Sequence, residues 1–379
     1  MGILMNQHQS LFPGDSIDGL SELMVVMENG TEEQSAEAAH ECFDKLLLHP
    51  ITEQQAERII PLLIHILRVE DKSVAKAVIL NRITEFLIRE RDGEDVFGVV
   101  SAYRPVHSYE SQDSAVWCRV LLRHLSDLIG LLQEEETTAI QAIYSIHLLQ
   151  SDDPRIEEAL LDTALHTSSS AVRLNSLMAL ADWRRRSGKS FNPSIAFGQI
   201  NQLPLYEAMR AVSMGIVSSG GGMRDKDMEM LLNGVTMPRY EQLLFPWADG
   251  SPAACCAQAA RMAMSELQWS ESQMLMWWQE ALRKAIACHQ HQCKMVTWEV
   301  GHTEVQWDEE CLQWHWNAPM LVADNMLCWR FGGKEEAGSF EEQPEGLREA
   351  LRLIVEHAVD VPHASMYGIK HLLYPAHYK

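Results

Sequence analysis

The segment from Ser151 to Arg186 constrains the fold more than any other part of this 379-residue chain. It begins with Asp153-Pro154, and an aspartate followed by proline in the first turn is typical of a helix start. Apolar residues then recur at helical spacing in two runs, separated by a short polar turn at 167–170. These runs predict two helices, and a single helix pair cannot bury both of its apolar faces. The segment therefore requires neighbouring helices to pack against.

Helical stripes also occupy most of the chain on the N-terminal side of this segment. Their apolar residues repeat every three or four positions, and Thr52 is a suitable N-cap for one of them. The predicted helices span Glu32–Leu48, Glu53–Val69, Val74–Arg89, Ser114–Leu132 and Thr137–Leu149. Val74 and Val116 lie 42 residues apart, within the period of about 40–47 residues of paired-helix repeats. Val116 and Val172 lie 56 residues apart, which requires an inserted segment.

The second helix of the 151–186 segment carries the pattern Val-Arg-x-x-Ser-x-x-Ala-Leu from Val172 to Leu180. Together with the Asp-Pro start, this pair resembles a HEAT repeat. Ser73–Leu87, Ser114–Leu128 and Pro252–Leu267 resemble weaker copies, so the resemblance covers about residues 30–270. It implies a mainly α fold, an α-solenoid of irregular HEAT-like helical pairs. A helical bundle without repeats is the alternative fold.

The composition changes after about residue 290. Lys294–Trp307 alternates between apolar and polar residues, which is typical of a β-strand, and Met326–Phe331 predicts a second strand. We therefore expect a small C-terminal β-containing elaboration. The predicted organisation is a loose leader (1–25), a HEAT-like helical repeat array (26–290), a Trp-rich β-containing insertion or cap (291–345), and a C-terminal helix and tail (346–379).

The charge balance excludes several classes of partner. The chain has 53 acidic and 31 basic residues, a formal net charge of -22 and a pI of about 5.1. Such a surface repels phosphates, so we expect neither direct nucleic-acid binding nor membrane association. A basic protein is the partner that this charge favours. Acidity also keeps many bacterial cytosolic proteins in solution, which is the alternative explanation.

The expected location is the cytoplasm. The N-terminus has neither the basic nor the apolar region of a secretory signal, and no apolar stretch approaches the length of a spanning helix. Eight cysteines at irregular positions in such a chain are typical of reduced thiols.

The known catalytic motifs do not occur. Gly188-Lys189-Ser190 has the end of a phosphate-binding loop, but Trp183 stands where that loop needs glycine. We interpret this segment as the basic end of a helix followed by a glycine cap. The chain also lacks a nucleophile elbow and an H-E-x-x-H motif, so we expect no catalytic residues, no enzyme activity and no cofactor.

One cluster has the residue types of a zinc site, namely Cys288, His289, His291 and Cys293. Four ligands within six residues would strain a single tetrahedron, which argues against a metal. If zinc were bound, a zinc-dependent enzyme using these residues would be the alternative function.

Two features favour binding to a protein. Asp15–Asp44 contains nine acidic residues and no lysine or arginine, and seven of the eleven tryptophans lie between Trp277 and Trp329. Tryptophan is enriched at interfaces, although it also fills cores. The candidate partner-binding residues are Glu32, Glu33, Glu37, Glu41, Asp44, Trp298, Trp307, Trp314 and Trp316. The expected function is a non-catalytic protein-binding module, most concretely an acidic immunity or antitoxin-type protein that neutralises a basic toxin or effector. An assembly scaffold or adaptor is the alternative within the same class.

Overall fold

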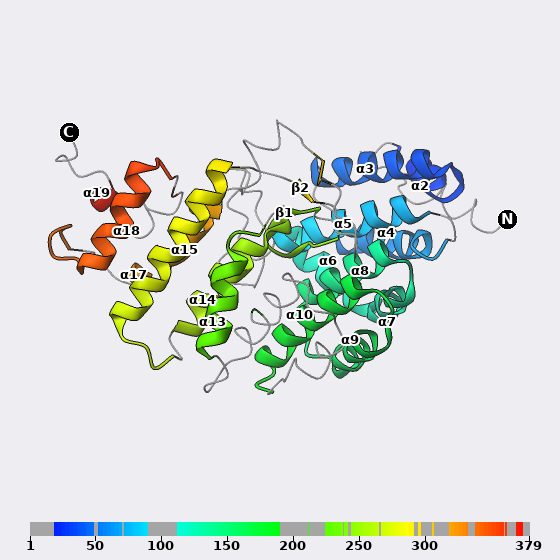
Figure 1. Ribbon diagram of the computed structural model, residues 1–379. Coiled ribbons are helices and arrows are strands. Elements are labelled where there is room, and N and C mark those ends of the chain that lie inside the picture. Colours follow the sequence, from blue (N-terminus) through cyan, green and yellow to red (C-terminus); the bar gives the residue numbers. More distant parts are fainter. Residues whose placement is uncertain are drawn as a thin grey trace. The chain divides into compact units, whose positions relative to one another are not determined.

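The computed structural model confirms that the chain is mainly helical (Figure 1). It describes residues 19–48, 52–69, 72–89, 112–189, 212, 224–237, 239–241, 244–264, 267–291, 295–296, 305–306, 318–332, 338–359, 361 and 369–373. The chain divides into two compact units. The N-terminal unit consists of Met1–Val96 and Tyr103–Trp183, and the C-terminal unit consists of Phe97–Ala102 and Arg184–Lys379. This division falls inside the predicted 26–290 array, whose bounds stay a prediction.

The N-terminal part of the chain forms the helices that its apolar stripes predict. They are α2 (Leu20–Asn29), α3 (Glu32–Leu48), α4 (Glu53–Ile66), α5 (Ser73–Arg89), α6 (Gln112–Arg123), α7 (Leu125–Gly130), the 3-10 helix η1 (Leu131–Gln133), α8 (Glu136–Leu148), α9 (Pro154–His166) and α10 (Ser170–Arg186). The single helix predicted over Ser114–Leu132 is interrupted at His124, which leaves the helical backbone conformation. The His124 ring pairs there with the Asp127 carboxylate at 3.1 Å.

Local chemistry fixes the ends of these helices. Thr52 Oγ1 accepts the Gln55 amide at 3.3 Å, and the Thr52 amide donates to Gln55 Oε1 at 2.8 Å, which forms a capping box. Asp153 Oδ1 accepts the Arg155 amide at 2.9 Å, with Pro154 in the first turn.

A glycine cap ends α10, as the sequence predicted. Gly188 has φ +65°, a left-handed conformation that glycine adopts without strain. The Gly188 amide donates to Arg185 O at 3.1 Å, and the Lys189 amide donates to Arg184 O at 2.8 Å. These two bonds form a Schellman motif, and the Gly188-Lys189 segment is therefore a helix end.

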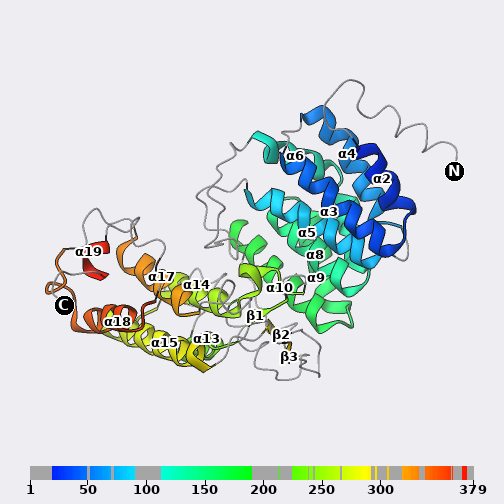
Figure 2. The ribbon, with the colours of Figure 1, turned by 90° about the horizontal axis from the view of Figure 1, so that it is seen from above.

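The N-terminal unit packs helices that are not consecutive in the sequence, in addition to neighbours such as α2 and α3. The helix α5 packs between α3 and α8, while α4 packs against α6, so successive helices alternate between two rows. Figure 2 shows α3, α5 and α8 lying side by side. Between the rows, the rings of Phe43 and Trp117 are fully buried with their centroids 6.2 Å apart.

Lys72 joins three of these helices. Its ammonium group donates to Met27 O at 2.8 Å and to Gly30 O at 3.0 Å, which are carbonyls at the C-terminal end of α2. It also donates to Ser35 Oγ of α3 at 2.7 Å. Burial lowers the pKa of Lys72. Because Lys72 directly precedes α5, this charge fixes α2 and α3 against the start of α5.

The C-terminal unit is described by itself. Its elements are α13 (Asp225–Gly234), β1 (Arg239–Tyr240), η2 (Trp247–Gly250), α14 (Pro252–Met264), α15 (Glu271–His291), β2 (Met295–Val296), β3 (Val305–Gln306), α17 (Ala318–Phe331), α18 (Glu345–Glu356) and α19 (Lys370–Leu373). The helix α14 packs on α13 and α17, and α15 packs on α17 and α18. The two-residue strand β2 pairs in parallel with β1 and antiparallel with β3, with Met295 opposite Arg239 and Gln306.

The strand predicted at Met326–Phe331 is wrong, because these residues form the end of α17. Val322, Ala323, Met326 and Leu327 are buried, which is the spacing of a helical face. The six-residue window was too short to reveal this period.

Trp247, Trp277 and Trp278 of this unit are buried in its core, whereas Trp269 and Trp329 are half-buried. Trp277 and Trp278 are buried edge to face at 4.9 Å, and Trp278 lies 6.4 Å from Trp329. The Trp277 indole donates to Met228 O at 3.0 Å, which ties α15 to α13.

Candidate binding surface

The five predicted acidic residues of α3 are all exposed. Four of them, Glu33, Glu37, Glu41 and Asp44, follow one another at intervals of four, four and three residues, so they share one side of the helix. We call these four residues the acidic face. The opposite side of this helix packs into the core through the buried residues Ala39 and Phe43. The hydrogen bond from Lys72 to Ser35 also holds the helix in place.

Glu32 has a different environment from the acidic face. Its carboxylate accepts the Val74 amide and the Ser73 hydroxyl, both at 3.0 Å. These bonds, the one from the Val74 amide first, lower the pKa of Glu32. Glu32 therefore caps the start of α5 and is a structural residue, although its sequence position does not distinguish it from Glu33.

The acidic face is only partly compensated by basic residues. Glu41 lies 3.5 Å from Lys45 and Asp44 lies 3.3 Å from Arg82, and the side chains of both acids are 61% exposed. Within the described residues, Glu33 and Glu37 make no side-chain hydrogen bond or ion pair. Their carboxylates are therefore available to an external cation.

Two carboxylates of α4 are engaged by arginines of α6. Glu53 of α4 lies 3.1 Å from Arg119 and 2.9 Å from Arg123 of α6, and these hydrogen bonds lower its pKa. Glu57 also pairs with Arg123, and the pKa of Arg123 is raised in turn. These charges hold α4 and α6 together.

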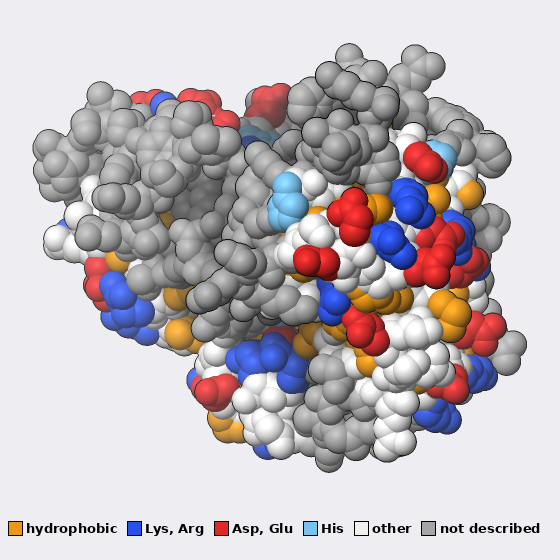
Figure 3. Space-filling view, turned by 90° about the vertical axis from the view of Figure 1, so that its left-hand side faces the viewer, with side chains coloured by type: hydrophobic (Ala, Val, Ile, Leu, Met, Phe, Trp, Pro, Cys, Tyr) orange, Lys and Arg blue, Asp and Glu red, His pale blue; other side chains and the backbone are white. Residues whose placement is uncertain are grey.

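The described surface has few apolar side chains. Large exposed hydrophobic residues there are limited to Val26, Val74 and Met276. In the space-filling view, acidic and basic side chains lie side by side and hydrophobic side chains form small separate groups (Figure 3). Within the described ranges, no helix is both long enough and apolar enough to cross a membrane. Charge is therefore the main chemical feature of this surface.

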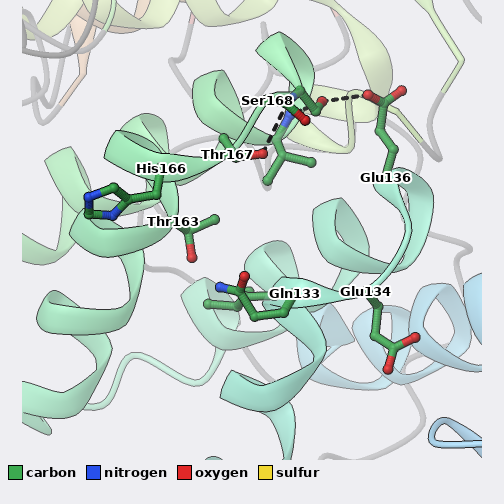
Figure 4. Close-up of a pocket in the computed structure, with 10 residues that line it drawn as sticks. Gln133, Glu134, Glu136, Thr163, His166, Thr167 and Ser168 are labelled. Carbon is green, nitrogen blue, oxygen red and sulfur yellow. Dashed lines mark hydrogen bonds between the residues drawn. The ribbon is translucent and has the colours of Figure 1, made fainter.

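A polar pocket lies where η1 and the N-terminal end of α8 meet the end of α9 and the start of α10 (Figure 4). Its volume is about 440 Å³. The lining residues are Leu132, Gln133, Glu134, Glu136, Thr163, His166, Thr167, Ser168, Ser169 and Val172. We call this site the polar pocket. It belongs entirely to the N-terminal unit.

Several polar groups in the polar pocket already have partners. Glu134 lies 2.9 Å from the ammonium of Lys76, and Ser169 Oγ donates to Glu136. The imidazole of His166 pairs with the exposed Asp162 at 2.9 Å. Sequence reasoning missed the pocket because it treated 167–170 only as a turn. The available signal was Thr163, a hydroxyl residue on the buried face of α9.

The remaining sequence candidates fall mostly outside the described residues. Trp298, Trp307, Trp314, Trp316 and Cys293 lie outside them, as do the side chains of His289 and His291. Cys288 is half-buried, its thiol donates to Thr236 O at 3.5 Å, and burial raises its pKa. In the described part of the chain, no three potential metal ligands gather in one place. The zinc site stays a prediction.

No protein-family model, curated protein or solved structure matches this chain.

Proposed function

We propose that this protein is a non-catalytic protein-binding module built as an α-solenoid of irregular HEAT-like helical pairs. The alternation of α3, α5 and α8 with α4 and α6 supports this, because stacked helix pairs produce that packing order. The α9–α10 pair also shows what the arginine of its Val-Arg pattern does. Arg173 donates to Ala164 O at 3.0 Å and to Thr167 O at 2.6 Å, so the Val-Arg position caps the preceding helix.

The partner that we propose is a basic protein recognised by the acidic face. The observation that carries this proposal is the pair Glu33 and Glu37, two exposed carboxylates one turn apart without a partner in the described structure. Like charges at this spacing destabilise a helix, so an incoming lysine or arginine relieves a repulsion as well as forming a contact. The net charge of -22 further accelerates the approach of a basic partner.

The most concrete form of the proposal is an immunity or antitoxin-type protein of the cytoplasm that neutralises a basic toxin or effector. A toxin that acts on nucleic acid is commonly basic because it contacts phosphates, and an acidic face competes for the same surface. Such a protein needs no catalytic residues of its own.

A charge-reversed pull-down tests this function. The tagged full-length chain, the double variant Glu33→Lys/Glu37→Lys and a control variant Glu158→Lys are incubated with an extract of the source cells at low ionic strength. Glu158 is exposed on α9, a different helix from the one that carries the acidic face. We expect the wild type and the control to retain one basic protein that high salt releases, and the double variant to lose it.

The captured protein is then purified and its affinity measured by calorimetry. We expect the double reversal to weaken binding about tenfold or more. Co-expression decides the immunity form, because a toxin partner arrests growth unless this chain is present. Equal retention by the wild type and the double variant would remove the acidic face from the proposal.

A further inference from the structure

An apolar stripe on α5 accompanies the acidic face. Val74, Val78 and Arg82 follow one another at intervals of four residues, so they lie on one side of this helix. Val74 is 52% exposed, which makes it one of the few large exposed hydrophobic residues of the described surface, and Val78 is half-buried. We call Val74 and Val78 the valine pair.

Contacts near both ends of the stripe place it along α3. At the start of the two helices, the Val74 amide donates to the carboxylate of Glu32 at 3.0 Å, and Glu32 directly precedes Glu33 of the acidic face. Further along, Arg82 lies 3.3 Å from Asp44, which belongs to the acidic face. The two helices therefore run in the same direction, and Figure 2 shows them side by side.

The unpaired acids and the valine pair occupy the same half of this surface. Glu33 and Glu37 lie in the half of α3 that begins beside Val74, and they have no partner within the described structure. Each pair repeats after four residues, about 6 Å along its helix. The axes of packed helices lie about 8–10 Å apart. This surface therefore presents two neighbouring stripes that run in the same direction, one acidic and one apolar.

Two neighbouring stripes of different chemistry favour a helix as the element that binds them. In a strand, successive side chains point to opposite faces, so each face offers a single row. A helix carries adjoining rows on one side, the first at positions i and i+4 and the next at i+3 and i+7. An amphipathic helix can therefore place basic side chains over the carboxylates and aliphatic side chains over the valines at the same time.

We propose that the basic partner binds through an amphipathic helix that lies along α3 and α5. Its lysine or arginine side chains, one turn apart, pair with Glu33 and Glu37. Its aliphatic side chains, one turn apart on the adjoining side, contact Val74 and Val78. This inference rests on the proposed function, because it names the element that the acidic face recognises. It adds a contribution from the valine pair that attraction between charges alone does not require.

Binding of synthetic peptides to the full-length chain tests this proposal without the natural partner. The probe is a fluorescent, helix-forming peptide with two lysines one turn apart, two leucines one turn apart on the adjoining side, and alanine and glutamine elsewhere. Fluorescence anisotropy at constant ionic strength measures its affinity. We expect a dissociation constant on the order of 0.1 mM, because one short helix makes few contacts. A scrambled peptide of the same composition is expected to bind about tenfold more weakly.

Two variants and one control separate the stripes. Val74→Thr/Val78→Thr keeps the branched shape but makes the valine pair polar, so it is expected to weaken binding of the probe about five- to tenfold. Glu33→Lys/Glu37→Lys is expected to weaken it about tenfold or more. Met276→Gln, a comparable change at an exposed apolar residue of α15, is expected to leave the affinity unchanged. Urea midpoints equal to that of the wild type confirm that the variants are folded.

Methyl NMR shows where the probe binds. The valine methyl groups are isotope-labelled, and the signals of Val74 and Val78 are assigned from their loss in the threonine variant. Both are expected to shift saturably as the probe is added. The proposal is overturned if the probe does not bind, if the scrambled peptide binds equally well, or if these signals do not move.

The variants also distinguish this inference from the proposed function. If the charge reversal abolishes binding and the threonine variant binds like the wild type, the amphipathic helix is overturned and the acidic face stands. If both variants bind like the wild type, neither the valine pair nor the acidic face recognises the probe, and both proposals lose their support.

Discussion

Glutamates occur both on the acidic face of α3 and in the contact between α4 and α6, but they have different roles in the two regions. On α4, Glu53 and Glu57 are held by Arg119 and Arg123 of the neighbouring helix. On α3, Glu33 and Glu37 have no partner in the described structure. Carboxylates that are paired with basic residues of a neighbouring helix hold the two helices together. Carboxylates without such a pair can bind an external cation.

Because of this difference, substitutions in the two regions are expected to change two different measurable quantities. Changes at engaged charges alter the free energy of unfolding, and changes at free charges alter the affinity for a partner. The buried Lys72 is the extreme engaged case, because three acceptors depend on it.

The largest stability effect is expected from Lys72→Met. The apolar side chain fills similar space but leaves Met27 O, Gly30 O and Ser35 Oγ without their donor. Leaving such groups unpaired costs about 2–3 kcal/mol of unfolding free energy. Urea denaturation measures it, with the more exposed Lys45→Met as the control. A loss no larger than that of the control would show that Lys72 does not join α2, α3 and α5.

The second prediction compares charge reversals in the two regions. The reversal Glu33→Lys/Glu37→Lys is expected to reduce partner affinity about tenfold or more and to leave the urea midpoint unchanged. The reversal Glu53→Lys/Glu57→Lys is expected to leave affinity unchanged and to lower the midpoint, because two lysines then face Arg119 and Arg123. Calorimetry with the captured partner and urea denaturation supply both readings. If both reversals weaken binding equally, general charge and not the acidic face attracts the partner.

A smaller stability effect is expected from Asp153→Ala. Asp153 is an engaged carboxylate that caps α9 by accepting the Arg155 amide at 2.9 Å. Loss of an N-cap costs about 1 kcal/mol of unfolding free energy. The substitution is compared with Glu158→Ala in the same helix. An equal midpoint for the two variants would mean that Pro154 and the packing of α9 fix the helix start without the cap.

The sequence predicted those features that depend on neighbouring residues. Thr52, Asp153 and Gly188 marked helix ends because their bonds reach only a few positions along the chain. The acidic residues of α3 were placed on one helix for the same reason, since their spacing is local.

Features that depend on distant residues were not predictable. Glu32 looked like its neighbour Glu33 until its partner Val74, 42 residues away, was known. Lys72 and the polar pocket were missed for the same reason, because their parts come from separate helices. The misassigned strand at Met326–Phe331 has a different cause, since a window of six residues cannot separate a period of two from one of 3.6.

The smallest effect concerns pH and again separates engaged carboxylates from the rest. Hydrogen bonds lower the pKa of Glu32, Glu53 and Asp153 in the folded chain. A lowered pKa contributes stability that is fully present above the ordinary carboxyl pKa of about 4 and is lost as the pH falls through the folded value. We therefore expect the urea midpoint to fall below about pH 4. The double variant Glu32→Gln/Glu53→Gln is expected to start slightly lower at neutral pH and to lose less on acidification. Parallel curves for variant and wild type would mean that these two carboxylates are bonded no more strongly in the folded chain than in the unfolded one.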